Sequence, residues 1–304
     1  MKRALGAIFF ALVVGSVLLA AVRVSGAVQG ELPGDPIEGG RVYDNWIQAL
    51  DLEPPQGDQP LWETQTDNPR SGVVTWRCVE CHGWDYKGLE GAYGPSSTHY
   101  TGFPSLNEMV GAGQDEVRAW LNGSNNPQHN FLFYSTRAAV DDLIAFLLTQ
   151  QVDTDLLIDP STGLSYGNLK RGQALYQGSC ASCHGERGET INFGSENSPL
   201  NLGDLAVADP WQTVHVIRFG DPIGRMQASE QLGWSLNMVA DVLAYTQTLP
   251  RANPEYGITL SNSDETIDVE NQGDIEPIIW AAFAMMLLIG ASLGWDHYQQ
   301  RQGT

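Results

Sequence analysis

The chain has 304 residues, of which 42% are hydrophobic, and its 36 acidic and 16 basic side chains give a formal net charge of −20. This composition excludes a largely disordered chain and is sufficient for two small domains. The acidic balance argues against nucleic acid as a partner, because phosphate binding requires clustered Lys and Arg. It fits either simple solubility or electrostatic steering toward a basic partner.

Residues 1–27 are predicted to be a signal peptide or a signal anchor. Lys2 and Arg3 precede an uncharged apolar run over residues 4–22, and small residues follow where a signal peptidase cuts. The run is long for a cleaved signal and Arg23 lies near the cut, so cleavage and retention both stay open. In either case the segment is expected to direct the following residues across a membrane.

Residues 38–151 are predicted to form the first of two similar units. The unit consists of a short helix with Gly four residues before Tyr, a Cys-x-x-Cys-His-Gly run, an amphipathic helix ending in Gly, and a last helix. These parts lie at residues 39–43, 78–83, 117–123 and 140–146. The last helix reads Val-x-Asp-apolar-apolar-Ala-aromatic, which is helical spacing with one apolar face.

An insertion over residues 51–77 separates the first helix of this unit from its Cys run. It contains four prolines, together with Trp62 and Trp76. Because it is too long for a plain connector, it is predicted to be functional or to cover part of the fold.

A linker over residues 152–167 leads to the second unit, residues 168–251. The same four parts recur in the same order, at residues 172–176, 180–185, 214–220 and 239–245. Here only three residues separate Tyr176 from Cys180, so the insertion is absent. His215 aligns with Arg118 of the first unit and is interpreted as a helix-face residue without a role.

The C-terminal part is predicted to anchor the chain in a membrane. An acidic, polar linker over residues 252–276 precedes an uncharged apolar run over residues 277–295. As a helix this run is about 28 Å long, close to the thickness of a bilayer core, and Trp280 and Trp295 lie near its ends. Arg301 after the run fits a cytoplasmic C-terminus. The run could instead be a buried core helix.

The two Cys-x-x-Cys-His runs are the strongest chemical signal. Two cysteines at this spacing can bond to both vinyl groups of one haem, and the next histidine is then its proximal iron ligand. A redox dithiol or half a zinc site uses similar spacing, but a zinc site would need the two pairs brought together. We predict two covalently bound haem c groups, attached at Cys78, Cys81, Cys180 and Cys183 and ligated by His82 and His184.

With these motifs, both units resemble class I c-type cytochrome domains. The resemblance covers residues 38–150 and 168–250 and implies an all-α fold: two cytochrome c-like haem domains in tandem plus the C-terminal transmembrane helix. In that family the first helix crosses the last through a contact between Gly and an aromatic residue. Gly39, Tyr43 and Phe146 match that contact in the first unit, and Gly172, Tyr176 and Tyr245 match it in the second.

The resemblance also implies a sixth iron ligand a few residues after the third helix. Met226 lies six residues past Gly220 and is predicted to ligate haem two, with Met238 as the rival. In the first unit His129 lies at the same offset from Gly123 and is predicted to ligate haem one. Met109 and His99 are the rivals there, and a loop histidine without a role is a further alternative.

The expected function is electron transfer between a membrane or periplasmic oxidoreductase and a terminal acceptor, in the respiratory chain. The expected location is the inner (cytoplasmic) membrane, with the haem domains in the periplasm. The expected partner is a redox protein, and a basic docking face on it is one of the two interpretations of the acidic charge. No catalytic residue is predicted. The alternative is a dihaem enzyme, thiosulfate dehydrogenase-like or peroxidase-like, acting at the first haem; a haem-based sensor or structural subunit is a third interpretation.

Overall fold

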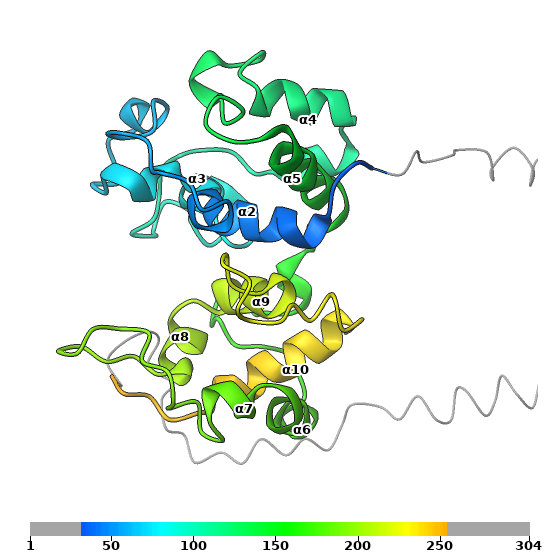
Figure 1. The fold of residues 1–304 in the computed structure, drawn as a ribbon. Helices are drawn as coiled ribbons and strands as arrows, with labels where there is room; N and C mark the ends of the chain where they lie inside the picture. Colours follow the sequence, from blue (N-terminus) through cyan, green and yellow to red (C-terminus); the bar gives the residue numbers. More distant parts are fainter. Residues whose placement is uncertain (1–31, 254–304) are drawn as a thin grey trace, which may run out of the picture. The chain divides into compact units, whose positions relative to one another are not determined.

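The structure is a computed structural model that describes residues 32–253 (Figure 1). In this range the regular elements are helices, with two isolated β-bridges and no strand. The α-helices are α2 (Pro36–Ala49), α3 (Cys78–His82), α4 (Gln114–Leu121), α5 (Arg137–Thr149), α6 (Leu169–Ser179), α7 (Ala181–His184), α8 (Leu202–Ala208), α9 (Pro210–Phe219) and α10 (Leu236–Thr246). The helical character expected for an all-α fold is therefore present.

Short 3-10 segments occupy parts of the connections. They are η1 (Trp62–Thr64), η2 (Gly72–Trp76), η3 (Gly88–Glu90), η4 (Asn107–Gly111), η5 (Pro127–His129) and η6 (Thr154–Leu156). Two of them, η1 and η2, lie in the predicted insertion, and η5 carries His129.

Within residues 32–253 no helix is long and apolar enough to cross a bilayer. The predicted signal or anchor over residues 1–27, almost all of the acidic linker over 252–276 and the predicted transmembrane helix over 277–295 lie outside the described residues.

The first and last helices of residues 38–151, here called half one, cross closely. A Cβ atom on Gly39 of α2 would collide with the backbone carbonyl of Asp142 and with Phe146 on α5, so only glycine fits. Beside the crossing, the Tyr43 ring packs 5.4 Å from that of Phe146. The Tyr43 hydroxyl donates to the Gly83 carbonyl at 2.6 Å, directly after the Cys run, so the crossing also positions the motif.

Residues 168–251, here called half two, repeat this arrangement with α6 and α10. A Cβ atom on Gly172 would collide with the Asp241 carbonyl, and the Tyr176 and Tyr245 rings lie 5.3 Å apart. The Tyr176 hydroxyl donates to the Gly185 carbonyl at 2.7 Å, again directly after the Cys run. The predicted contact between Gly and an aromatic residue is thus present in both halves.

The linker over residues 152–167 packs with half two. Leu157 and Ile158 are buried in the same apolar cluster as residues of α9 and α10. Ile158 also pairs with Ser165 in an isolated bridge, and the Ser165 hydroxyl donates to the Ala240 carbonyl at 2.7 Å. The linker is therefore an ordered part of the fold.

Helix α9 joins the two halves, because it contributes Phe219 to the apolar core of half one. Its His215 is 1% exposed, so the interpretation as a helix-face residue without a role was wrong. Nε2 of His215 lies 2.9 Å from the Gly40 carbonyl, which can only accept, so this nitrogen carries the proton. Nδ1 then accepts from the Tyr86 hydroxyl at 2.9 Å. Alignment with Arg118, which pairs with Asp141 within half one, could not have indicated this contact between the halves.

Candidate haem sites

Helix α3 presents the Cys-x-x-Cys-His run of half one. Residues three apart on a helix lie on the same face, so Cys78 and Cys81 point to one side. The helix ends at His82, and the next residue, Gly83, has a φ of 75° that favours glycine and turns the chain away. The turn is held by the Gly83 N–H, which donates to the Val79 carbonyl at 2.9 Å.

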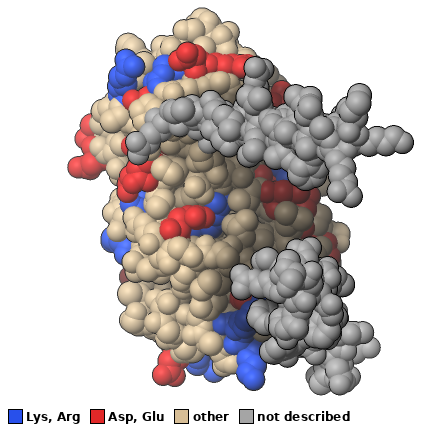
Figure 2. Space-filling view, turned by 90° about the vertical axis from the view of Figure 1, so that its right-hand side faces the viewer, with Lys and Arg blue, Asp and Glu red and all other residues tan. Residues whose placement is uncertain are grey.

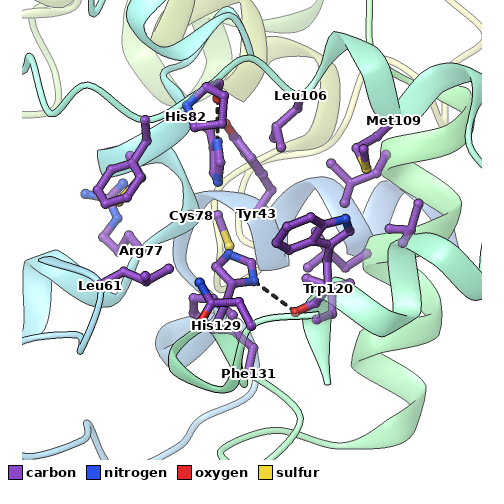
Figure 3. A pocket seen from close by; sticks show the side chains of 18 of the residues that line it. Tyr43, Leu61, Arg77, Cys78, His82, Leu106, Met109, Trp120, His129 and Phe131 are labelled. Carbon is purple, nitrogen blue, oxygen red and sulfur yellow. Dashed lines mark hydrogen bonds between the residues drawn. The ribbon is translucent and has the colours of Figure 1, made fainter. Parts of the chain in front are cut away.

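A cavity of about 330 Å³ lies in front of this helix (Figure 3). Both cysteines and His82 line it, and so do residues from α4, α5, the insertion and the loop after α4. Its walls are mainly apolar, with Tyr43, Leu106, Val117, Leu121, Phe131, Leu143 and Leu147 among the lining residues. An apolar, partly enclosed space with a few convergent polar groups is typical of a cofactor site.

The two histidines of the cavity are oriented by backbone carbonyls. Nδ1 of His82 lies 3.0 Å from the Pro104 carbonyl, and Nδ1 of His129 lies 3.1 Å from the Trp120 carbonyl. A carbonyl only accepts, so both Nδ1 atoms carry the proton, and both Nε2 atoms keep a free lone pair. Metal-bound histidines are commonly held in this way by a second set of contacts.

His82 and His129 face one another across the cavity, with ring centres 6.4 Å apart and ring planes inclined by 79°. A metal–imidazole bond of about 2 Å on each side, plus about 1 Å from nitrogen to ring centre, separates two axial imidazoles by about 6 Å. The observed separation therefore fits one iron between the two rings.

Burial favours the uncharged forms of His82, His129 and Cys78. It lowers the pKa of His82 to about 4, with His129 as the next cause, and it lowers the pKa of His129 as well. Both imidazoles are thus neutral at physiological pH, as ligands must be. Burial also raises the pKa of the Cys78 thiol to about 12.

The rival ligands differ in their positions. Met109 also lines the cavity, at its side next to Leu106 in Figure 3. His99 does not line it: its ring lies over Tyr93 at 4.6 Å between centres, and both ring nitrogens lie within 2.8 Å of the Arg70 guanidinium. The facing rings favour His129 over both.

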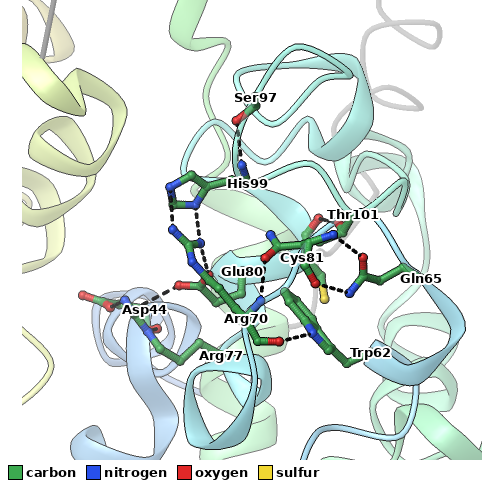
Figure 4. Close-up of polar contacts among 11 residues, drawn as sticks. Asp44, Trp62, Gln65, Arg70, Arg77, Glu80, Cys81, Ser97, His99 and Thr101 are labelled. Carbon is green, nitrogen blue, oxygen red and sulfur yellow. Dashed lines mark hydrogen bonds and ion pairs between the residues drawn. The ribbon is translucent and has the colours of Figure 1, made fainter.

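A polar cluster behind α3 was not predicted (Figure 4). Arg77 donates to Asp44 of α2 at 2.6 Å and to Glu80 at 3.4 Å, and Arg70 donates to Glu80 at 2.7 Å. Asp44 and Glu80 are buried, so each carboxylate depends on its arginine partner. The cluster fixes α3 to α2 and to the insertion, and no local motif marks it in the sequence.

In half two the Cys run begins at Cys180, directly before α7, and Gly185 with a φ of 82° follows the helix. Nδ1 of His184 is buried and makes no hydrogen bond among the described residues, and burial lowers the pKa of His184. Met226 lies half-buried against the core of half two, its N–H donating to the Asp221 carboxylate at 2.6 Å. Met238 lies half-buried in the first turn of α10. The pairing of His184 with Met226 remains a prediction.

Among residues 32–253, no three His, Cys, Asp or Glu side chains come together as a candidate metal site. No disulfide joins any of the four cysteines, and the two pairs lie in different halves.

Comparison with known proteins finds a similarity in the second half. Residues 167–246 match the family model described as cytochrome c oxidase, cbb3-type, subunit III. None of the curated proteins compared with the chain matches it. The match supports a c-type cytochrome domain over residues 167–246, and domains of this kind carry covalently bound haem c and transfer electrons. The Cys180, Cys183 and His184 run lies inside the matched range.

Proposed function

We propose that the chain is a membrane-anchored dihaem c-type cytochrome that passes electrons between a membrane or periplasmic oxidoreductase and a terminal acceptor. Bound haem supplies a one-electron ferric/ferrous couple, while the protein sets the potential and controls access. In this proposal Cys78 and Cys81 attach haem one and Cys180 and Cys183 attach haem two. The respiratory role is supported by the similarity of half two to an oxidase subunit family.

The observation that carries the proposal is the pair of facing imidazoles in half one. His82 and His129 come from opposite walls of one apolar cavity, each with Nδ1 bonded to a carbonyl. The helix crossing that frames this cavity repeats the crossing of the matched cytochrome domain, down to the hydrogen bond from Tyr to Gly. Half one is therefore proposed to be a second cytochrome c domain.

Different axial ligands would give the two halves different potentials. Haem one has His82 and His129 in this proposal, whereas haem two has His184 and Met226. Methionine ligation raises the potential of haem iron relative to a second imidazole. Half one is then the more reducing half, and electrons pass within the chain from half one to half two.

A relay is favoured over an enzyme by the position of His129. A catalytic haem needs an open or displaceable sixth position for its substrate. The His129 ring stands where a substrate would bind, held by Trp120 and packed 4.9 Å from the Phe131 ring.

The partner is proposed to be a redox protein with a basic docking face. Acidic and basic side chains are interspersed on the face shown in Figure 2, so the argument rests on the net charge of −20 rather than on one patch. Such a field speeds encounter with a basic protein and is screened by salt. The proposed location is the inner membrane, anchored by residues 277–295, with the haem domains in the periplasm.

The test is a redox titration of the full-length protein combined with mass spectrometry of the denatured chain. Two haem masses and two separate potentials are expected, the lower one lost when Cys78 and Cys81 are both replaced by serine. One haem mass, or a single potential assigned to half two, would reject the dihaem proposal. Rapid turnover of thiosulfate or peroxide would instead favour the enzyme.

A further inference from the structure

The insertion over residues 51–77 forms a folded unit of its own. The Trp62 indole donates to the Arg70 carbonyl at 2.8 Å, and the Trp76 indole donates to the Gly57 carbonyl at 3.0 Å. The backbone N–H of Gln59 donates to the Thr75 hydroxyl at 2.9 Å. These bonds join the two ends of the insertion, so it can transmit a mechanical constraint.

This unit contacts the loop that carries His129, here called the distal loop (residues 122–135). The side-chain amide of Gln59 donates to the carbonyl of Gln128 at 2.8 Å, one residue before His129. The Trp76 ring packs edge-on against Tyr134 with centres 4.8 Å apart. The insertion therefore touches the distal loop on both sides of the histidine.

The Gln59 contact is chemically specified. The side chain is 4% exposed, and its oxygen accepts from the Leu61 N–H at 2.6 Å while its nitrogen donates to Gln128. Turning the amide over would set donor against donor and acceptor against acceptor. Leaving a buried amide without these partners is unfavourable, so the hydrogen bond is strongly maintained.

Half two has no equivalent of this contact, because only three residues separate Tyr176 from Cys180. Its Met226 is held from within its own loop, by the Asp221 carboxylate. In half one the distal loop is held on one side by α4, through the Trp120 carbonyl, and on the other by the insertion. The insertion thus supplies a restraint that half two obtains locally.

We propose that residues 51–77 are a strap that holds His129 opposite His82, and that Gln59 is the positioning residue that joins the strap to the distal loop. The strap keeps the sixth position of the first haem filled and closed to external ligands. This inference rests on the proposed function, since it requires a haem between the two histidines.

The test compares Gln59→Leu with Gln65→Leu in the full-length haem protein. Gln65 is the matched control, because its amide bonds only to the backbone of Asn68 within the strap. The readouts are the ferric spectrum and the rate at which carbon monoxide binds the reduced protein. Loss of a second-shell contact commonly changes a metal site by about 10-fold or more, so Gln59→Leu should bind carbon monoxide about 10-fold faster. The haem of half two should be unchanged in both variants.

Each outcome decides a different claim. A Gln59→Leu protein that matches both wild type and Gln65→Leu would overturn the strap while leaving the proposed function intact. A wild-type protein without the spectrum of two imidazoles would overturn the proposed function itself. If Gln59→Leu fails to accumulate, Gln59→Glu keeps the acceptor for Leu61 but removes the donor for Gln128. It should show the same gain in binding, and wild-type behaviour would reject the strap.

Discussion

The two halves share the same crossing of their first and last helices, here called the frame. They differ in the residues that lie on the side facing His82 or His184. In each, a glycine lets the first helix cross the last at backbone contact, and a tyrosine hydroxyl holds the carbonyl after the Cys run. Beyond this frame, half one places His129 over the cavity with help from residues 51–77, and half two has a short connection and Met226. Backbone contacts at the crossing therefore tolerate large changes elsewhere in the chain.

The comparison separates two kinds of requirement. The crossing admits only glycine because a Cβ atom would meet backbone that cannot move aside. The distal position, in contrast, is carried on a loop whose length and supports differ between the halves. The free energy of unfolding should therefore depend most on the glycine helix crossings. The redox potential and the access of external ligands should depend most on the loops that carry the distal position.

Exchanging the distal ligand should have the largest effect. In the His129→Met variant we expect the lower potential to rise by on the order of 0.2 V, a fraction of the roughly 0.8 V range that axial ligands span. The two halves would then titrate close together. Potentiometry followed at the haem bands measures this shift, with Met109→Leu as the control at the rival position. A shift with Met109→Leu and none with His129→Met would transfer the ligand role to Met109.

Replacing the crossing glycines should disturb each half in the same way. Gly39→Ala and Gly172→Ala each force a methyl group into the carbonyl of the facing helix, and overpacking of this kind costs about 3 kcal/mol. Gly178→Ala is the control: it lies in the same helix as Gly172, has nothing within 4 Å of its added Cβ, and should stabilise by about 0.5 kcal/mol. Denaturant unfolding measures all three. Equal midpoints for Gly172→Ala and Gly178→Ala would contradict the shared frame.

The buried contact between the halves should rank next. His215→Phe leaves the Tyr86 hydroxyl and the Gly40 carbonyl without their partner, and each unpaired buried group costs about 1–3 kcal/mol. The double variant with Tyr86→Phe should recover part of that loss, because it removes the orphaned hydroxyl. A cycle of the two single variants and the double variant gives the coupling. Additive effects would mean that the hydrogen bond adds nothing.

His215→Phe should also alter how the free energy of unfolding changes in acid. Burial lowers the pKa of His215 from 6.5 to about 3. As the pH falls from about 6.5 to 3, the unfolded chain binds a proton that the folded chain does not, so stability decreases. His215→Phe should flatten this acid limb. Burial raises the pKa of Asp209 to about 7, which acts in the opposite direction, but both proteins share Asp209 and the difference isolates His215.

Local spacing predicted the helix crossings, and it selected a histidine that lines the cavity of half one. The offset of six residues from the helix-ending glycine selected His129 and Met226 alike, and His129 does face His82 across the cavity. The glycine and tyrosine positions of both crossings could be predicted because the same spacing occurs in both units. These features depend on residues that lie close in sequence or recur in both units.

The contacts that join distant segments could not be predicted. His215 bonds to a carbonyl 175 residues away, and Gln59 to one 69 residues away. Each donor or acceptor there is an ordinary polar residue in an unremarkable context, and its partner is a backbone atom without a sequence signature. The pair of Arg77 with Asp44 also joins segments 33 residues apart, although both partners are side chains. Only the folded chain brings such groups together.

The smallest effect on the free energy of unfolding is expected at the exposed ion pairs between half one and the linker. Lys87 of half one pairs with Asp153 at 2.9 Å and Asp155 at 2.8 Å, at the start of the linker, and both carboxylates are about half exposed. Solvent screens such pairs, so Lys87→Met should cost about 1 kcal/mol or less and the cost should vanish in high salt. Unfolding of wild type and variant at low and high ionic strength measures this. A salt-independent loss as large as that of His215→Phe would mean that the linker pair, rather than α9, holds half two against half one.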